Sequence, residues 1–129
     1  METRANQWFV AIVDDEAALR EATENLLKSA GFRTTDFASA EDFLQSGCGE
    51  GAGCLILDVR LPGMSGLDLQ RHLAGAGIHI PTVMTTAEQD RDGRIRTQAF
   101  RAGAVAFLHK PCAGDELLSA VRSVFGKGP

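Results

Sequence analysis

The chain has 129 residues, which corresponds to one domain, and its 44% hydrophobic and 23% charged residues exclude general disorder. The formal net charge of −4 argues against a nucleic-acid-binding surface, because such surfaces are strongly basic. No apolar run reaches the roughly 18 residues of a membrane span, and the polar stretch from Met1 to Gln7 lacks the pattern of a signal peptide. Three scattered cysteines fit a reducing compartment, so we expect a cytoplasmic protein.

The first third of the chain predicts two strands and two helices. Trp8 to Val13 is a continuous apolar run, typical of a strand that is buried on both faces. A helix follows and ends at Gly31, and its apolar positions form one stripe: Leu19, Ala22, Leu26, Leu27 and Ala30. Phe32 to Phe37 is more polar, as expected of a strand at a sheet edge. Ser39 is placed to cap a short helix that runs through Leu44.

The middle of the chain predicts a loop, a buried strand and a helix. The glycine-rich segment from Gly47 to Gly53 predicts a flexible loop. It is not a phosphate-binding loop, because it lacks the Lys-Ser/Thr ending and precedes a strand. The apolar run from Cys54 to Leu57 predicts the strand. Pro62-Gly63 marks a turn, and Ser65 can cap a helix whose buried face includes Leu69 and Leu73.

The last third predicts two strands and two helices. Ile80 to Thr86 is a strand in which Pro81 is tolerated near the start. A polar loop and helix run from about Glu88 to Ala102, and Ala104 to Leu108 forms the fifth strand. The final helix has apolar positions at helical spacing: Leu117, Leu118, Val121, Val124 and Phe125.

Five strands that alternate with five helices predict an α/β fold. The expected architecture is a doubly wound, five-stranded parallel sheet with helices on both faces. We expect a single domain over residues 1–129, with a core from about residue 8 to 125 and a tail from Gly126 to Pro129.

Polar side chains follow the ends of several predicted strands. Asp14 and Asp15 come directly after the first strand, and Asp58 closes the third. In an open α/β sheet, ligands bind at the carboxyl ends of the strands, so these carboxylates meet if the first and third strands are neighbours. Their mutual repulsion requires a compensating cation, and Mg²⁺, which prefers oxygen ligands, is the natural candidate.

Two further strand ends supply groups that suit a phosphoryl group. Thr86 ends the fourth strand with a hydroxyl donor, and Lys110 follows the fifth strand with a positive charge. Carboxylates, a cation, a lysine and a hydroxyl together predict a phosphoryl-transfer site in which one aspartate acts as the nucleophile.

Four motifs in this order resemble the receiver domains of two-component response regulators. They are Ile-Val-Asp-Asp-Glu (12–16), Leu-Asp-Val-Arg-Leu-Pro-Gly-Met-Ser-Gly (57–66), Thr-Ala (86–87) and Phe-Leu-His-Lys-Pro (107–111). The segments Ala-Glu-Asp-Phe-Leu (40–44) and Gly-Ala-Val-Ala-Phe-Leu (103–108) are similar to the FixJ-like branch of that family. The resemblance spans nearly the whole chain and implies a flavodoxin-like (βα)5 receiver fold with strand order 2-1-3-4-5.

The resemblance implies a role for each residue of the acidic cluster. Asp58 would be the phosphoacceptor, which takes a phosphoryl group from a phosphohistidine of a sensor histidine kinase. Asp15, Asp58 and the backbone carbonyl of Arg60 would hold the metal ion, with Asp14 acting largely through water. The ion would be Mg²⁺, with Mn²⁺ as an alternative.

A phosphorylation switch is implied as well. Lys110 would contact the phosphoryl group, Thr86 would move toward it, and Phe107 would then rotate inward. Arg60 and Glu88, which lie two residues after Asp58 and Thr86, would tune dephosphorylation. The surface that responds is formed by the fourth helix, the fifth strand and the fifth helix, through which FixJ-like members commonly form homodimers to activate a DNA-binding output domain.

We therefore expect a regulatory domain and not an enzyme, with transcription regulation as its output. Its expected partners are a sensor histidine kinase and a second copy of the chain, with no direct contact to nucleic acid or membrane and no output domain within the 129 residues. The chain differs from the family pattern in two places: the segment from Glu88 to Arg101 is about two residues longer than usual by comparison with the family, and Cys112 replaces an aromatic residue.

Three alternatives differ in class. A phosphatase that forms an aspartyl-phosphate of the haloacid-dehalogenase type would carry a second aspartate two residues after Asp58, where this chain has Arg60. A pseudo-receiver that never takes phosphate would lack one of the acidic pair, the acceptor or the lysine, and all are present here. A flavin-binding flavodoxin would need a phosphate-cradling loop after the first strand, where this chain has acids.

Overall fold

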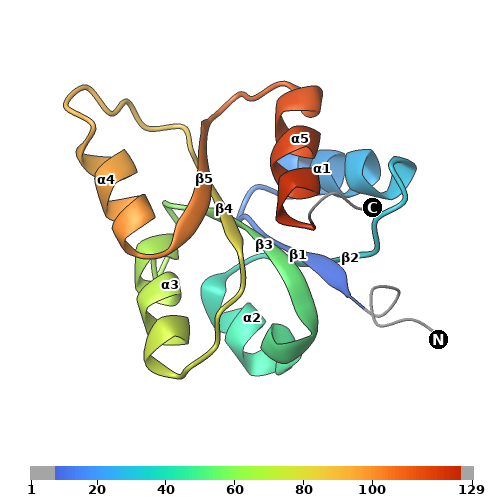
Figure 1. The fold of residues 1–129 in the computed structure, drawn as a ribbon, viewed down its shortest axis with the longest axis horizontal. Helices are drawn as coiled ribbons and strands as arrows, with labels where there is room; N and C mark the ends of the chain where they lie inside the picture. Colours follow the sequence, from blue (N-terminus) through green and yellow to red (C-terminus); the bar gives the residue numbers. More distant parts are fainter. Residues whose placement is uncertain (1–7, 126–129) are drawn as a thin grey trace.

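The computed structural model describes residues 8–125, and these form one five-stranded parallel sheet between two layers of helices (Figure 1). The strands are β1 (Phe9–Val13), β2 (Thr34–Phe37), β3 (Ala52–Asp58), β4 (Thr82–Thr86) and β5 (Ala104–His109). The helices are α1 (Ala17–Ser29), α2 (Ala40–Ser46), α3 (Gly66–Gly75), α4 (Arg94–Arg101) and α5 (Gly114–Val124). The polar start and the tail, predicted at Met1–Gln7 and Gly126–Pro129, lie outside the described residues.

The strand order is β2-β1-β3-β4-β5, and every neighbouring pair is parallel. This order confirms the predicted doubly wound fold. It places β1 beside β3 at the centre of the sheet, so the residues that follow these two strands lie next to each other. Across residues 8–125, no helix is both long and apolar enough to cross a membrane.

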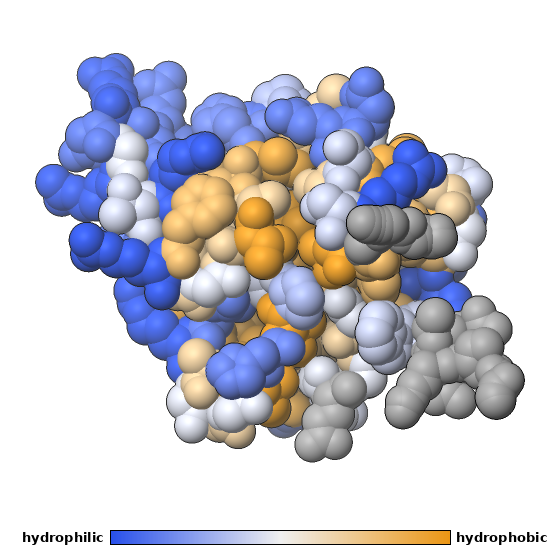
Figure 2. Space-filling model, viewed as in Figure 1, coloured by the Kyte–Doolittle hydropathy of each residue, from blue (hydrophilic) through white to orange (hydrophobic). Residues whose placement is uncertain are grey.

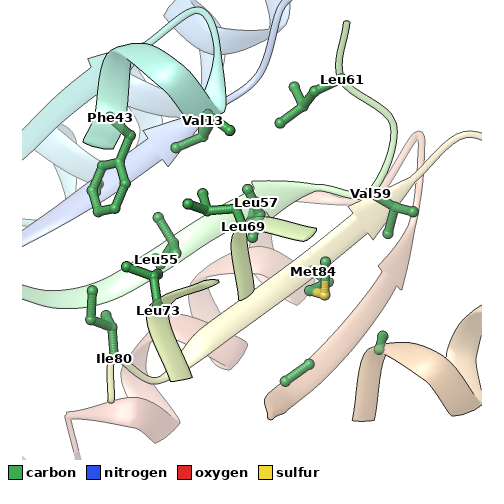
Figure 3. Close-up of a cluster of buried hydrophobic side chains, with 14 residues drawn as sticks. Val13, Phe43, Leu55, Leu57, Val59, Leu61, Leu69, Leu73, Ile80 and Met84 are labelled. Carbon is green, nitrogen blue, oxygen red and sulfur yellow. The ribbon is translucent and has the colours of Figure 1, made fainter. Parts of the chain in front are cut away.

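The sheet is covered on both faces, which explains its continuous apolar strands. Along β3, Leu55 and Leu57 pack into one cluster with α2 and α3, whereas Cys54 and Ile56 pack into the other with α1 and α5. This alternation follows from the two-residue period of a strand. Figure 3 shows the first cluster, in which Phe43 of α2 and Leu69 of α3 approach the strand from one side.

Two predicted helix caps are confirmed. The Ser39 hydroxyl accepts a hydrogen bond from the Asp42 N–H at 3.0 Å, and the Ser65 hydroxyl accepts one from the Asp68 N–H at 3.1 Å. Each bond satisfies an N–H at the start of a helix that has no partner within the helix. Gly31, predicted to end the first helix, follows α1 with φ of +96°, a conformation that glycine adopts at low cost.

The fourth helix lies within the segment predicted to hold a polar loop and a helix, from about Glu88 to Ala102. A loop occupies its first part, and α4 begins at Arg94. The Asp90 carboxylate accepts hydrogen bonds from the N–H groups of Ile95 and Arg96, both at 2.9 Å. These bonds stabilise the start of the helix from five and six residues back along the chain.

The starts of four strands differ from the prediction. β1 begins at Phe9 instead of Trp8, and β2 begins at Thr34 instead of Phe32. β3 begins at Ala52 instead of Cys54 because Ala52 pairs with Phe9 of β1 beyond a shift in register. The glycine-rich segment before it contains a short 3₁₀ helix, η2 (Cys48–Gly51). β4 begins at Thr82 instead of Ile80, directly after Pro81, which has no N–H to donate to a neighbouring strand.

An aromatic cluster closes the end of the sheet that lies opposite the acidic strand ends. The ring of Phe125, just after α5, lies 6.0 Å from the Trp8 ring and 5.6 Å from the Phe32 ring, between centroids. Gly53 of β3 leaves space for this cluster, because a Cβ atom there would lie 2.8 Å from the Phe125 ring. The cluster fixes the end of α5 against the start of β1.

Candidate functional site

The carboxylates of Asp14, Asp15 and Asp58 lie together at the carboxyl end of the sheet, as predicted. One oxygen of each lies within 4.8 Å of the others, because β1 and β3 are paired with Val13 opposite Leu57. Asp14 and Asp58 are buried, with 8% and 7% exposure, and Asp15 is exposed. Three carboxylate oxygens at this spacing match the ligand preference of a hard divalent cation.

Lys110, which follows β5, brings a positive charge between two of these carboxylates. Its Nζ donates to Oδ2 of Asp14 at 2.8 Å and to Oδ2 of Asp58 at 2.9 Å. The three side chains are between 9% and 15% exposed, so water screens these interactions only in part. The sequence prediction that Lys110 meets the acidic cluster is therefore confirmed in its geometry.

Burial and neighbouring charges have opposite effects on the pKa values of Asp58 and Lys110. Burial is the largest influence on Asp58 and raises the pKa of its carboxyl, against the opposing effects of Lys110 and the Arg60 N–H. Burial lowers the pKa of Lys110, but its hydrogen bonds to Asp14 and Asp58 outweigh that effect and raise the pKa overall. The lysine is thus firmly cationic, whereas ionised Asp58 lacks full compensation and stands to gain from a further cation.

Main-chain groups hold the two buried acids in place. Oδ1 of Asp58 accepts from the Arg60 N–H at 3.1 Å, and Oδ1 of Asp14 accepts from the Glu16 N–H at 3.0 Å. Gly66, the first residue of α3, approaches so closely that a Cβ atom there would lie 2.2 Å from the Asp58 carbonyl oxygen. The absence of a side chain at Gly66 therefore allows α3 to begin directly against the end of β3.

Thr86 lies at the end of β4 and is fully buried. Its hydroxyl oxygen accepts a hydrogen bond from the Glu88 N–H at 3.1 Å, and its carbonyl accepts one from the Lys110 N–H at 2.8 Å. Thr86 is therefore joined to the loop before α4 and also to the lysine of the acidic cluster.

Arg60 and Glu88, predicted separately as tuning residues, are in direct contact. Arg60 Nε donates to Glu88 Oε2 at 2.6 Å, and Arg60 Nη2 contacts the same oxygen. The Arg60 side chain is 71% exposed and that of Glu88 35%. The pair joins the loop after β3 to the loop after β4.

Phe107 lies on β5 opposite Met84 of β4 and is half-buried. Its ring centroid is 5.8 Å from the guanidinium carbon of Arg96 in α4, which also lies 5.2 Å from the Phe100 ring centroid. The structure therefore places Phe107 where α4 packs on β5, and Arg96 contacts two aromatic rings.

Sequence reasoning missed Arg20. This residue of α1 donates from Nη1 to the main-chain carbonyl of Asp14 at 2.8 Å and from Nε to Oδ2 of Asp36 at 3.3 Å. Its side chain is 20% exposed. No pattern in the sequence marks this arginine as part of the site. Its two partners come close to it only when the sheet has folded.

An apolar cavity of about 550 Å³ lies next to the acidic cluster. Its walls come from α1 and the start of α5, with Leu26 and Leu117 among the lining residues, and Lys110 and Cys112 line it from the loop after β5. Leu19, which also lines it, is 40% exposed. An open apolar surface therefore adjoins a strongly charged site.

Comparisons with known proteins agree with this geometry. The family model of the response regulator receiver domain matches residues 10–122. Nodulation protein W of Bradyrhizobium diazoefficiens is 45% identical over 113 residues, which cover 88% of this chain and 49% of that protein. Response regulator protein TodT of Pseudomonas putida is 41% identical over 129 residues, which cover 100% of this chain and 55% of that protein. The chain thus spans about half the length of these curated relatives.

A solved structure supports the same relationship. The crystal structure of FixJ-N superimposes with a TM-score of 0.83 at 31% identity, and the match covers 100% of this chain and 98% of that one. The family model, the relatives and the fold agree with the motifs at the strand ends. The chain belongs to the family of response regulator receiver domains, regulatory domains of two-component signalling, and within it to the FixJ-like branch.

Proposed function

We propose that Asp58 is the phosphoacceptor of this receiver and takes its phosphoryl group from a phosphohistidine of a sensor histidine kinase. The observation that carries the proposal is the position of Asp58 at the end of β3, among two other carboxylates and 2.9 Å from Lys110 Nζ. A carboxylate oxygen attacks phosphorus, the P–N bond breaks, and the imidazole leaves with its electron pair. The lysine charge then stabilises the phosphoryl oxygens.

The donor set supports a divalent cation at the same site. Asp14, Asp15, Asp58 and the backbone carbonyl of Arg60 would hold Mg²⁺, or Mn²⁺ in its place. Such an ion supplies positive charge that offsets the repulsion between carboxylate and phosphoryl oxygens. The fit rests on three carboxylate oxygens within 4.8 Å of one another and on the incomplete compensation of buried Asp58.

We assign the apolar cavity beside the site to the kinase. A donor must approach Asp58 with its histidine exposed, and the cavity between α1 and α5 offers apolar surface directly beside that path. An apolar side chain that flanks the donor histidine would fill it. In this proposal the charged groups carry out the phosphoryl transfer, and the apolar cavity binds the kinase. The proposed location of this exchange is the cytoplasm.

The proposed output surface is formed by α4, β5 and α5 and binds a second copy of the chain when Asp58 is phosphorylated. Figure 2 shows apolar surface over β5, between α4 and α5. Phe100 and Val105 are 40% and 53% exposed there. The exposed arginines of α4 and the acidic first turn of α5 carry opposite charges, which suits a twofold pair in which α4 of one copy meets α5 of the other.

The phosphorylation step can be tested by intact mass. We expect the protein, incubated with acetyl phosphate and Mg²⁺, to gain the mass of one phosphoryl group, and the Asp58→Asn variant to gain none. Asp68→Asn is the matched control, because Asp68 is exposed on α3 and, among residues 8–125, its carboxylate bonds only to its helix neighbour Arg71. An adduct that persists in Asp58→Asn contradicts the assignment.

The same experiment separates the alternatives. A pseudo-receiver takes no phosphoryl group in any variant. A phosphatase that uses an aspartyl-phosphate would release phosphate continuously from other phosphate esters, whereas a receiver forms one adduct and loses it slowly. Sedimentation of the phosphorylated protein then tests the output surface: we expect a dimer that Val105→Glu abolishes and that Ala74→Glu, at an exposed position of α3, leaves intact.

A further inference from the structure

Arg20 joins three parts of the fold behind the acidic cluster. It lies in α1, and its guanidinium donates to the Asp14 carbonyl at 2.8 Å and to Asp36, near the end of β2, at 3.3 Å. With 20% exposure the side chain is largely enclosed. A planar guanidinium that makes two bonds in different directions fixes its partners more tightly than a single flexible donor does.

The carbonyl that Arg20 holds belongs to the peptide unit between Asp14 and Asp15. Because a peptide unit is planar, fixing its oxygen also fixes the direction in which the chain continues to the Cα atom of Asp15. The Asp15 side chain is exposed, and in the described part of the chain it makes no hydrogen bond. The position of its carboxylate therefore depends on the main chain of this loop.

We propose that Arg20 is a positioning residue for the acidic pair: by holding the Asp14 carbonyl it directs the Asp15 carboxylate toward Asp58 and so sets the affinity for the divalent cation. This inference rests on the proposed function, because it presumes that the acidic cluster binds the cation. Arg20 itself touches neither the cation nor the phosphoryl group.

The charge of Arg20 works against this effect. A guanidinium near three carboxylates weakens cation binding by repulsion, so removal of the charge alone would tighten binding. Loss of positioning would weaken it. Arg20→Lys separates the two, because lysine keeps the positive charge but cannot form the two-directional pair of bonds.

The test is the Mg²⁺ dependence of phosphorylation by acetyl phosphate, together with Mg²⁺ titration by calorimetry, on the full chain. For Arg20→Lys and Arg20→Ala we expect the half-saturating Mg²⁺ concentration to rise by about tenfold, the usual effect of losing a residue that orients a metal ligand. At saturating Mg²⁺ the rate should return to within roughly twofold of the unmodified protein, since the cation then orders the loop. A merely structural defect would lower that maximal rate too.

Two further variants sharpen the result. Asp36→Ala removes the second anchor of Arg20 and should weaken Mg²⁺ binding in the same direction, and combining it with Arg20→Lys should add little. Arg71→Lys is the matched control, because Arg71 pairs with Asp68 on the exposed side of α3. An unchanged half-saturating concentration in Arg20→Lys, or a lowered one in Arg20→Ala, overturns the inference. If the unmodified protein binds no Mg²⁺, the proposed function is wrong, and the inference about Arg20 is then wrong as well.

Discussion

Arg60 and Glu88 form an ion pair that links the loop after β3 to the loop after β4, with 2.6 Å between Arg60 Nε and Glu88 Oε2. The same Glu88 donates its N–H to the Thr86 hydroxyl, and its carbonyl lies 3.1 Å from Nε2 of His109. Glu88 is therefore held by its side chain and by both of its main-chain polar groups. Movement of Thr86 toward a phosphoryl group on Asp58 would break one of these contacts.

We predict that the ion pair between Arg60 and Glu88 prolongs the lifetime of the phosphoryl group on Asp58. Arg60→Ala and Glu88→Ala should each speed the loss of the adduct, because either change opens the loops to attacking water. An exposed ion pair contributes at most about 1 kcal/mol, so the acceleration should not exceed about fivefold. Intact mass recorded over time after removal of acetyl phosphate measures it. The double variant should be no faster than the faster single one, and two independent, multiplying effects would contradict the prediction.

Thr86→Val tests the hydroxyl without changing the size of the side chain. We expect loss of about 1 kcal/mol of stability, since the Glu88 N–H loses its acceptor, as chemical denaturation would measure. Phosphorylation of Asp58 should continue, but the phosphorylation-dependent dimer should be lost. Thr86→Ser, which keeps the hydroxyl, is the control. A valine variant that still forms the phosphorylated dimer would show that the hydroxyl has no part in the switch.

From the raised pKa of Asp58 we predict that the stability of the protein depends on pH. Burial raises its pKa, so the native state binds more protons than the unfolded state over the window between the unfolded and the native pKa. Stability conferred by this group therefore falls as pH rises through that window. In metal-free buffer, Asp58→Asn should melt at a higher temperature than the unmodified protein at neutral pH, and the gap should narrow in acid. Thermal unfolding followed by circular dichroism measures this, with Asp68→Asn as the exposed control. A gap that is independent of pH would contradict the assignment.

We predict that adding one methyl group at Gly66 lowers the stability of the protein strongly. A Cβ atom there would lie 2.2 Å from the Asp58 carbonyl oxygen, so Gly66→Ala must push α3 away from β3. We expect a loss of about 2–3 kcal/mol in the free energy of unfolding, typical of overpacking, together with slower phosphorylation. Gly75→Ala, at the other end of the same helix, meets no atom within 4 Å and should be neutral or slightly stabilising. Similar denaturation midpoints for the two variants would count against the described contact.

We predict that removing Arg96 shifts the equilibrium between the two orientations of the Phe107 ring. Its guanidinium lies 5.8 Å from the Phe107 ring centroid, and rotation of Phe107 would give up this contact. A cation–π contact at an exposed site contributes about 0.5–1 kcal/mol, so Arg96→Ala should favour the rotated state by up to about fivefold. We expect the one-phosphoryl adduct to form at lower acetyl phosphate concentrations, as intact mass measures. Arg71→Ala, whose arginine pairs with Asp68 on the exposed side of α3 and lies outside the proposed output surface, should leave the concentration dependence unchanged.

The parts of the site that the sequence predicted are those set by strand order alone. Asp14, Asp58 and Lys110 each follow a strand, and a doubly wound sheet brings such residues to one edge. Arg20 could not be predicted, because its partner Asp36 lies 16 residues further on and reaches it only through the pairing of β2 with β1.

The fold differs from prediction where tertiary contacts determine an element's boundary. The first residue of α4, for which the sequence made no prediction, depends on the Asp90 carboxylate, which reaches the N–H groups of Ile95 and Arg96. A capping side chain ordinarily reaches an N–H two or three residues ahead, so this arrangement has no simple sequence signature. The early start of β3 at Ala52 likewise depends on pairing with Phe9, across the register shift in β1.

The aromatic cluster at the far end of the sheet contains an intrinsic fluorescent probe. The sequence contains one tryptophan and no tyrosine, so its near-ultraviolet emission arises from Trp8. Trp8 lies at the opposite end of β1 from Asp14, roughly 20 Å away at the rise of an extended strand. Its fluorescence therefore reports whether Phe125 stays docked at the end of α5, and it reports this separately from anything that happens to the carboxylates.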